Sequence, residues 1–225
     1  MNNQEHSVEA AIGGKSWTLS TGKLAPQANG SVLARVGDTV VMATVVMSGK
    51  VREGIDYLPL LVDYEEKLYA AGKIKGSRWI KREGRPSDEA ILSGRVTDRT
   101  FRPLFDERVR NDIQVVVTVL SVDGDNDPDI IGLNAASAAI AISDIPWNGP
   151  VAGVKVAKIG DKFVLNPLIS ELKNKDLNFE TFISGVKERI NMIELAGDDG
   201  KEDDLLKAFK LGSDEINKII EFEGK

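Results

Sequence analysis

Two consecutive apolar segments, at 113–121 and 130–143, constrain the fold of this chain more than any other feature. The first, IQVVVTVLS, is an almost unbroken run of β-branched residues, which is typical of a strand buried on both faces. The second, IIGLNAASAAIAIS, is small and apolar nearly all round, which predicts a helix buried on most of its sides. Because both need protein around them, the remaining chain must form layers on either side.

Alternating segments separated by glycines predict many antiparallel strands around this centre. Residues 8–47 predict a β-meander, in which the glycine-first turn Gly37-Asp38 joins two strands as a type II′ hairpin. A second glycine-first turn, Gly160-Asp161, joins another pair. The predicted strands are 8–12, 16–25, 31–36, 39–47, 57–64, 113–121, 151–159, 162–166, 179–184 and 189–195.

Three further regions predict helices or short helical turns. One helix begins at Ser87, a hydroxyl cap followed by two acidic residues, and ends before Pro103. Residues 168–176 predict a polar connection or a short helix. Residues 201–225 predict two short terminal helices that are broken at Gly212.

The order of these elements predicts a single α+β, or mixed α/β, unit. The sequence has no internal repeat and no low-complexity linker, and 225 residues are enough for one large core. We therefore predict one domain over 1–225, with a flexible tail at 1–9 and the terminal helices at 201–225.

Several classes of protein are excluded by what the sequence lacks. It has no cysteine, which excludes disulfides and thiolate metal sites. Its only histidine, His6, lies in a polar tail, where we expect it to be solvated. No segment approaches the roughly 18 apolar residues of a membrane span, and the tail does not resemble a signal peptide. We expect a soluble, cytoplasmic protein that does not bind a membrane.

Positive charge is concentrated in one part of an otherwise acidic chain. Residues 67–110 contain twelve basic and six acidic residues, whereas the whole chain has a net charge of −6. The rest of the chain therefore carries a net charge of −12. A local positive region on an acidic protein predicts an anionic ligand, which we interpret as an RNA backbone.

Three arginines form a stripe along the helix that begins at Ser87. Arg95, Arg99 and Arg102 are spaced i, i+4, i+7, so they lie within roughly 60° of each other on a helical wheel. Ile91 and Leu92 flank this stripe, so we expect the arginines to emerge from a half-buried surface.

The alternative to an RNA-binding stripe is pairing within the helix. Asp98 lies within reach of both Arg95 and Arg102. However, one aspartate cannot neutralise three guanidinium groups. We therefore expect some of this positive charge to face solvent.

Three segments resemble the first core domain of bacterial polynucleotide phosphorylase. They are GKLAPQANGSVLARVGDTVVMATVV, the stretch containing REGRPS and RVTDRTFRPLF, and NDPDIIGLNAASAAIAISDIPWNGPVAGVKV. The resemblance covers about residues 10–166 and continues more weakly to the C-terminus. It implies an RNase PH-like core, a mixed sheet with helices packed on its faces, in the class also called ribosomal protein S5 domain 2-like.

The resemblance also implies a function for the full-length proteins. They carry two such cores, assemble as a ring-shaped homotrimer and degrade single-stranded RNA from its 3′ end. Phosphate is the nucleophile and a divalent cation, Mg²⁺, is required. This chain resembles only the first quarter or third of such a protein, and DNA is not an expected partner.

The same resemblance assigns RNA-binding roles to residues in the positive region. The family usually has Phe-Phe-Arg-Arg where this chain has Trp79-Ile80-Lys81-Arg82, in a loop that lines the path of the RNA. Trp79 would stack on a base, while Lys81 and Arg82 would hold phosphates; an aromatic face beside cations suits single strands of any sequence. Ile80 removes one aromatic platform, and Lys81 replaces a bidentate fork with a point charge. Four more arginines occupy positions where the family has RNA-contacting or structural arginines: Arg85, Arg95, Arg99 and Arg102.

The resemblance predicts that this chain has no catalytic and no metal-binding residues. Leu172, Asn178 and Glu180 occupy the positions of the aspartate, aspartate and lysine of the active second core. Asp127 falls near the serine-rich phosphate pocket, where a carboxylate would repel phosphate. The nearby Asp176 is left as a candidate metal ligand, with a solvated loop acid as the alternative.

We therefore interpret the chain as the non-catalytic first core of a phosphorolytic 3′-to-5′ exoribonuclease, which guides RNA and builds the ring. Two alternatives stay open. One is a stand-alone RNase PH-like exoribonuclease. The other is a structural scaffold whose arginines pair internally.

Overall fold

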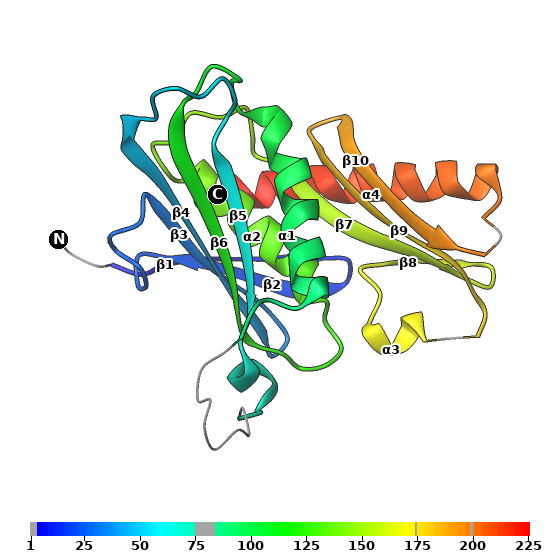
Figure 1. Cartoon of the computed structure of the whole chain (residues 1–225). Helices are drawn as coiled ribbons and strands as arrows, with labels where there is room; N and C mark the ends of the chain where they lie inside the picture. Colours follow the sequence, from blue (N-terminus) through cyan, green and yellow to red (C-terminus); the bar gives the residue numbers. More distant parts are fainter. Residues whose placement is uncertain (1–3, 75–83, 174, 199) are drawn as a thin grey trace.

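The computed structural model describes residues 4–74, 84–173, 175–198 and 200–225. These residues form two β-sheets, with α2 packed between them and α4 running along the second sheet (Figure 1). The strands are β1 (His6–Ile12), β2 (Lys15–Thr21), β3 (Gly30–Val36), β4 (Thr39–Val51), β5 (Leu60–Glu66), β6 (Asn111–Ser121), β7 (Ala152–Ile159), β8 (Lys162–Leu165), β9 (Leu177–Val186) and β10 (Arg189–Gly197). The helices are α1 (Asp88–Phe101), α2 (Pro128–Ala141), α3 (Ile169–Leu172) and α4 (Glu202–Glu223), with 3₁₀ turns at Leu68–Ala71 and Arg102–Leu104.

Strands β1 to β4 form the predicted antiparallel meander. Each pairs with the next, and the β3–β4 turn has a positive φ of 60° at Gly37, as a glycine-first turn requires. The structure corrects the predicted flexible tail, because residues 6–9 already belong to β1. His6 pairs with Thr21 of β2, so the alternating pattern of β1 begins before the apolar residues that suggested a strand.

The first sheet is mixed and has the order β1-β2-β3-β4-β6-β5. Strand β6 is antiparallel to β4 and parallel to β5, which begins three residues later than predicted. The prediction that β6 is buried on both faces holds for one face, where Ile113, Val115 and Val117 are buried. On the other face Gln114 is exposed and Val116 is half-buried.

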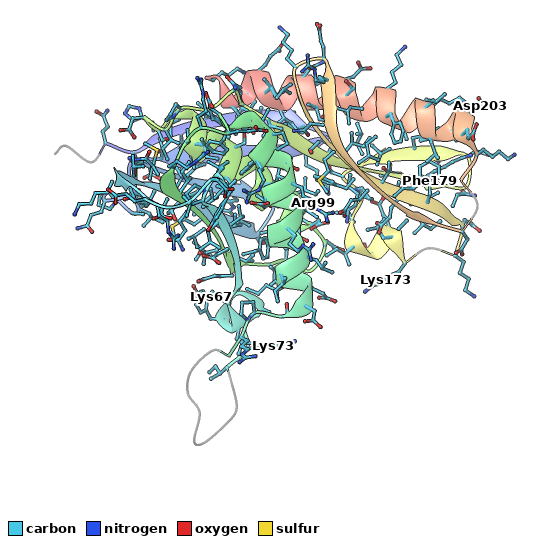
Figure 2. The ribbon with its side chains drawn as sticks, turned by 45° about the horizontal axis from the view of Figure 1, so that its top comes forward. Lys67, Lys73, Arg99, Lys173, Phe179 and Asp203 are labelled. Carbon is cyan, nitrogen blue, oxygen red and sulfur yellow. The ribbon has the colours of Figure 1, made fainter. Side chains whose placement is uncertain are left out.

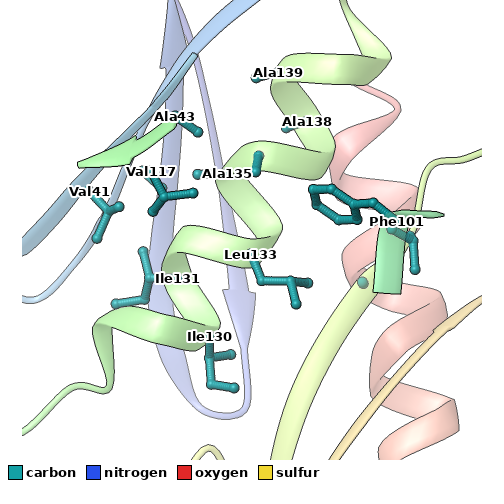
Figure 3. Close-up of a cluster of buried hydrophobic side chains, with 14 of the residues drawn as sticks. Val41, Ala43, Phe101, Val117, Ile130, Ile131, Leu133, Ala135, Ala138 and Ala139 are labelled. Atoms are coloured by element: carbon teal, nitrogen blue, oxygen red, sulfur yellow. The ribbon is translucent and has the colours of Figure 1, made fainter. Parts of the chain in front are cut away.

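Helix α2 is the buried helix that the small apolar segment predicts. Every residue from Ile130 to Ile140 is buried. Figure 3 shows its side chains facing Val41 and Val117 of the first sheet on one side and Phe101 of α1 on another. Gly132 allows this close packing, since a Cβ there would lie 2.6 Å from Val117 Cγ1.

Helix α1 begins where the sequence predicts. The Ser87 side chain caps it by accepting a hydrogen bond from the Ala90 amide at 3.0 Å, and two acidic residues occupy the first turn. Gly94 lets the helix lie along the edge of β5, because a Cβ there would be 3.3 Å from the Val62 carbonyl oxygen. Helix α1 therefore packs closely against β5.

The second sheet has the order β10-β9-β7-β8, and both of its predicted hairpins are present. The prediction of two terminal helices is wrong: α4 is one helix of 22 residues that continues through Gly212. Gly212 lies in the interface with the sheet, where a Cβ would be 2.8 Å from Ile183 Cδ1 and 3.3 Å from Val154 Cγ2. This glycine therefore permits close packing and does not end a helix.

Both sheets share one hydrophobic core, which extends from Trp17 in the first sheet to Phe179 in the second. The predicted α+β class, with a mixed sheet and helices on its faces, is confirmed. Among the described residues, no helix has the length and apolar character needed to cross a membrane.

Candidate nucleic-acid interface

Helix α1 carries two arginines on the face opposite its buried side. Ala90, Thr97 and Phe101 are buried and fix the helix against the core. Arg95 and Arg99 are exposed, and neither forms an ion pair with any other residue that the structure describes. Their guanidinium groups are therefore available to an anion in solvent.

Two more cations of the positive region are exposed on the chain leading into α1. Lys73 and Arg85 form no ion pair within the described ranges. Figure 2 shows Lys67 and Lys73 at one end of the molecule, with Arg99 farther along α1. Lys67, in contrast, pairs with Glu65 at 2.7 Å.

Arg102 is held by the protein itself. Its guanidinium makes two bonds to the Asp98 carboxylate, at 2.6 and 3.0 Å. It also donates to the carbonyl oxygens of Leu58 and Leu60, at 3.1 and 3.0 Å. The alternative of internal pairing therefore describes Arg102, while Arg95 and Arg99 keep their charge exposed.

The three loop residues with predicted RNA contacts lie outside the described residues. These are Trp79, Lys81 and Arg82. Their role in RNA binding stays a prediction from the sequence.

Ile91 and Leu92, which flank the arginines, are about half exposed, with exposed fractions of 49% and 59%. The buried side of α1 is formed by Ala90, Gly94 and Thr97 and leaves both residues on the outer surface beside the arginines.

A groove of about 350 Å³ runs between α1 and β5 and brings Arg95 near several carboxylates. Asp63, Glu65 and Asp98 line the groove together with Arg95. Two of these carboxylates already have cationic partners, since Asp98 pairs with Arg102 and Glu65 pairs with Lys67.

A second pocket, of about 170 Å³, lies between α1, the start of α2 and the second sheet. Asp127 caps α2 by accepting a hydrogen bond from the Asp129 amide at 3.0 Å, and its other oxygen bonds Lys155 Nζ at 2.9 Å. Ser93 of α1 donates to Asp129 at 2.6 Å, and Glu194 of β10 completes the polar lining. Carboxylates thus occupy the helix terminus at which an anion could otherwise bind.

Burial and neighbouring charges shift the pKa values of the residues in and around this pocket. Burial, followed by the charge of Asp127, raises the pKa of Asp129. Burial alone would lower the pKa of Lys155, but the charges of Asp127 and Glu180 outweigh it and raise that pKa. Burial and the negative charge of Asp129 raise the pKa of Tyr64. Lys155 therefore stays protonated and neutralises only part of the pocket.

The residues at the predicted catalytic positions do not come together as a metal site. Leu172 ends α3, whereas Asn178 and Glu180 lie on β9, and Glu180 approaches Lys155 at 3.9 Å. The Asp176 carbonyl accepts a hydrogen bond from the Gly160 amide at 2.9 Å. Within the described ranges, no three His, Asp or Glu side chains are grouped so that they could hold a metal ion, so these residues do not fit Mg²⁺.

Sequence reasoning identified Asp127 but missed the residues around it. Ser93, Asp129, Lys155 and Glu194 come from four different elements and meet only in the folded chain. The acidic run DGDNDPD, directly before a buried helix, was the signal that could have indicated a polar site at this helix terminus.

Solved structures with the same fold include rice Rrp46 and an archaeal exosome. Rice (Oryza sativa) Rrp46 has a TM-score of 0.73 and 15% identity, over 99% of this chain and 94% of that chain. The Archaeoglobus fulgidus exosome with RNA bound to the active site has a TM-score of 0.69 and 18% identity, over 97% of this chain and 87% of that chain. At these identities the likeness establishes the fold.

Curated relatives are closer in sequence but much longer. Polyribonucleotide nucleotidyltransferase of Heliobacterium modesticaldum is 48% identical over 212 residues, which are 94% of this chain and 30% of that protein. The same enzyme of Thermus thermophilus is 48% identical over 220 residues, covering 98% of this chain and 30% of that protein. The chain thus spans about 30% of the length of these relatives, and the predicted resemblance to a first core of polynucleotide phosphorylase is confirmed.

Two family models match almost the whole chain. Residues 13–146 match domain 1 of the 3′ exoribonuclease family, RNase PH, and residues 149–215 match domain 2. The two matches meet in the segment that joins α2 to β7. The chain therefore belongs to the 3′ exoribonuclease family.

Proposed function

We propose that this chain is the RNA-guiding first core of a phosphorolytic 3′-to-5′ exoribonuclease. The observation that carries the proposal is the exposed charge of Arg85, Arg95 and Arg99, on and just before α1, none of which forms an ion pair with another described residue. The rest of the chain is acidic, so a polyanion would be drawn to this face. The loop with Trp79, Lys81 and Arg82 immediately precedes it and would add stacking and phosphate contacts.

Similar proteins support the proposal that the full-length protein acts on RNA. The relatives are named polyribonucleotide nucleotidyltransferases, and one structure of the same fold is an exosome with RNA bound to its active site. In the proposal, the full-length protein works in the cytoplasm as a homotrimeric ring and uses Mg²⁺ and phosphate. Single-stranded RNA is the partner of this core.

The proposal assigns phosphorolysis to another part of the full-length protein. Asp127 and Asp129 at the start of α2 would repel inorganic phosphate, and Glu194 adds a third carboxylate. Incubation of the 225-residue chain with poly(A), magnesium and phosphate tests this point. We expect no release of nucleoside diphosphate above background, whereas clear release would favour the stand-alone exoribonuclease.

The salt dependence of RNA binding tests the guiding role. Affinity for a single-stranded RNA oligonucleotide should fall steeply between low and physiological salt. The double variant Lys81→Ala/Arg82→Ala should flatten the slope by about 1.4, since each lost phosphate contact to a single strand contributes about 0.7. Lys162→Ala/Lys210→Ala, on the second sheet and α4, removes the same charge elsewhere and is the matched control.

An unchanged salt dependence of RNA binding in Lys81→Ala/Arg82→Ala would favour the scaffold alternative. The internal hydrogen bonds of Arg102 are consistent with that alternative. We expect weak affinity for a lone monomer, because a ring concentrates three copies of the loop. Gel filtration with light scattering on the same sample gives the oligomeric state at which each slope applies.

A further inference from the structure

Arg99 lies in the last turn of α1, the helix that carries the proposed RNA-binding arginines. Pro103 follows this turn and has no amide hydrogen to donate. The carbonyl groups of a last helical turn lack partners within the helix, so they need donors from elsewhere. The position of Arg99 therefore depends on contacts that reach this turn from outside α1.

The second sheet supplies one of these donors. Asn191 of β10 donates from Nδ2 to the Thr100 carbonyl oxygen at 2.9 Å. Thr100 directly follows Arg99 in the chain, and β10 and α1 lie side by side (Figure 1). Asn191 thus caps the end of α1 from a strand that comes much later in the sequence.

Two buried hydroxyl groups fix the orientation of the Asn191 amide. The Ser184 hydroxyl donates to Asn191 Oδ1 at 3.0 Å. Since a hydroxyl has one proton, Thr100 Oγ1 is then the donor in its 2.9 Å contact with Ser184 Oγ. The Thr100 hydroxyl also lies 3.5 Å from Met192 Sδ, which is a weak acceptor. Thr100, Ser184 and Asn191 therefore form a closed ring of hydrogen bonds that directs Nδ2 at the Thr100 carbonyl oxygen.

We propose that Asn191 is a positioning residue for RNA binding, because it holds the last turn of α1 in place and so fixes where Arg99 presents its guanidinium group. The inference rests on the proposed RNA-guiding function of α1. Helix ends fray, and a frayed last turn would let the Arg99 side chain sample more conformations. Ordering these conformations on binding would lower the affinity for RNA. Asn191 acts through α1 and makes no contact with RNA itself.

Asn191→Asp tests this role, because it keeps the shape of the side chain and the acceptor for Ser184 but replaces the donor Nδ2 by an oxygen. At pH 7 and low salt, the affinity of the 225-residue chain for a single-stranded RNA oligonucleotide should fall about threefold. Asn217→Asp is the matched control on α4, where Oδ1 accepts from the Glu188 amide at 3.2 Å and is kept by the substitution. It adds the same charge and should leave the RNA affinity unchanged.

The pH dependence of the Asn191→Asp variant provides a rescue of the missing donor. The introduced carboxyl is partly buried, so its pKa should lie above the ordinary value of about 3.9. At about pH 5 the protonated carboxyl can again donate to the Thr100 carbonyl oxygen. The affinity of the variant, relative to the parent chain at the same pH, should therefore recover as the pH is lowered.

Combined variants show whether Asn191 acts through Arg99. In the Arg99→Ala background, Asn191→Asp should cause no further loss of RNA affinity. In the Arg85→Ala background, where the altered residue precedes the other end of α1, it should still cause a loss of about threefold. Equal losses in the two backgrounds would overturn the proposal, because Asn191 would then act on the fold as a whole.

Hydrogen exchange of the RNA-free chain separates this proposal from the proposed function. In Asn191→Asp at pH 7, the amides of Thr100 and Phe101 should exchange about threefold faster than in the parent, while those of Ile91 and Leu92 keep their rates. Such a change in a chain that binds no RNA at any salt concentration would confirm the link between α1 and β10 and contradict the RNA-guiding function. Unchanged exchange at Thr100 and Phe101 would overturn the positioning role, whatever the RNA affinity.

Discussion

Lys155 Nζ lies 2.9 Å from Asp127 Oδ2 and joins the second sheet to the first turn of α2. Both side chains are largely buried, with exposed fractions of 22% and 19%. Both residues line the pocket between α1, the start of α2 and the second sheet. Lys155 is the only cation among the residues lining this pocket, and Asp129 and Glu194 add further carboxyl groups. Loss of Lys155 would leave a group of carboxylates without compensation in a low-dielectric site.

We expect Lys155→Met to lower the free energy of unfolding by about 2 kcal/mol at pH 7, because it removes one partner of a buried pair. The double variant Asp127→Asn/Lys155→Met should recover part of that loss, since the charge that Lys155 balances is then also removed. Urea denaturation of the two single variants and the double variant measures the coupling. Simple additivity of the two losses would show that the pair contributes nothing specific.

Arg102→Ala should destabilise the fold by about 1–2 kcal/mol, because it leaves Asp98 unpaired and removes the Arg102 hydrogen bonds to the carbonyl oxygens of Leu58 and Leu60. Arg99→Ala, three residues earlier in the last turn of α1, should change stability by less than about 0.5 kcal/mol. Thermal denaturation of both variants checks the contrast. Equal effects would mean that the internal bonds of Arg102 do not stabilise the chain in solution.

Gly30→Ala should cost about 3 kcal/mol, since an added Cβ would lie 2.0 Å from the Ala139 carbonyl oxygen of α2. Gly49 in β4 is exposed, and apart from its chain neighbours no atom of the described residues lies within 4 Å of its Cβ position. Gly49→Ala is therefore the matched control and should be neutral or slightly stabilising. Chemical denaturation of both variants gives the difference, and similar values would contradict the close contact of β3 with α2.

Glu223→Gln should make the free energy of unfolding less sensitive to rising pH. The folded state holds the Glu223 proton because burial raises its pKa, whereas the unfolded chain releases the proton at about pH 4.3. The stabilisation from this proton is complete below the unfolded pKa and is lost as pH rises toward the folded one, at about 1.4 kcal/mol per pH unit.

Unfolding free energies of the parent and the Glu223→Gln variant between about pH 5 and 8 check this sign. Both proteins should carry His6→Gln, so that the only histidine does not titrate in the same range. A difference between them that does not change with pH would mean that Glu223 has an ordinary pKa in the folded chain.

The strands, the buried helix α2 and the cap of α1 could be predicted from the sequence because local patterns encode them. Alternation places Val41, Ala43 and Val45 on one face of β4, whatever the rest of the chain does. The Ser87 hydroxyl caps α1 with atoms only three residues apart. The segment around Ile131 is apolar on all sides, so it is buried wherever it packs.

The break predicted at Gly212 was wrong for a physical reason. A glycine that ends a helix cannot be distinguished in the sequence from a glycine that permits close packing of a helix against a sheet. The difference lies in Ile183 and Val154, which approach Gly212 from strands far away in the chain. The same limit applied to Arg102, whose partners at Leu58 and Leu60 lie more than forty residues earlier.

By itself, the sequence determined the α+β class, the family resemblance and the concentration of positive charge before and along α1. Only the tertiary structure decided which of those charges are free, and that Lys155, Asp127, Asp129 and Glu194 share one pocket. Charge and periodicity are properties of neighbouring residues along the chain. Pairing and burial depend on which distant segments the fold brings within a few ångströms.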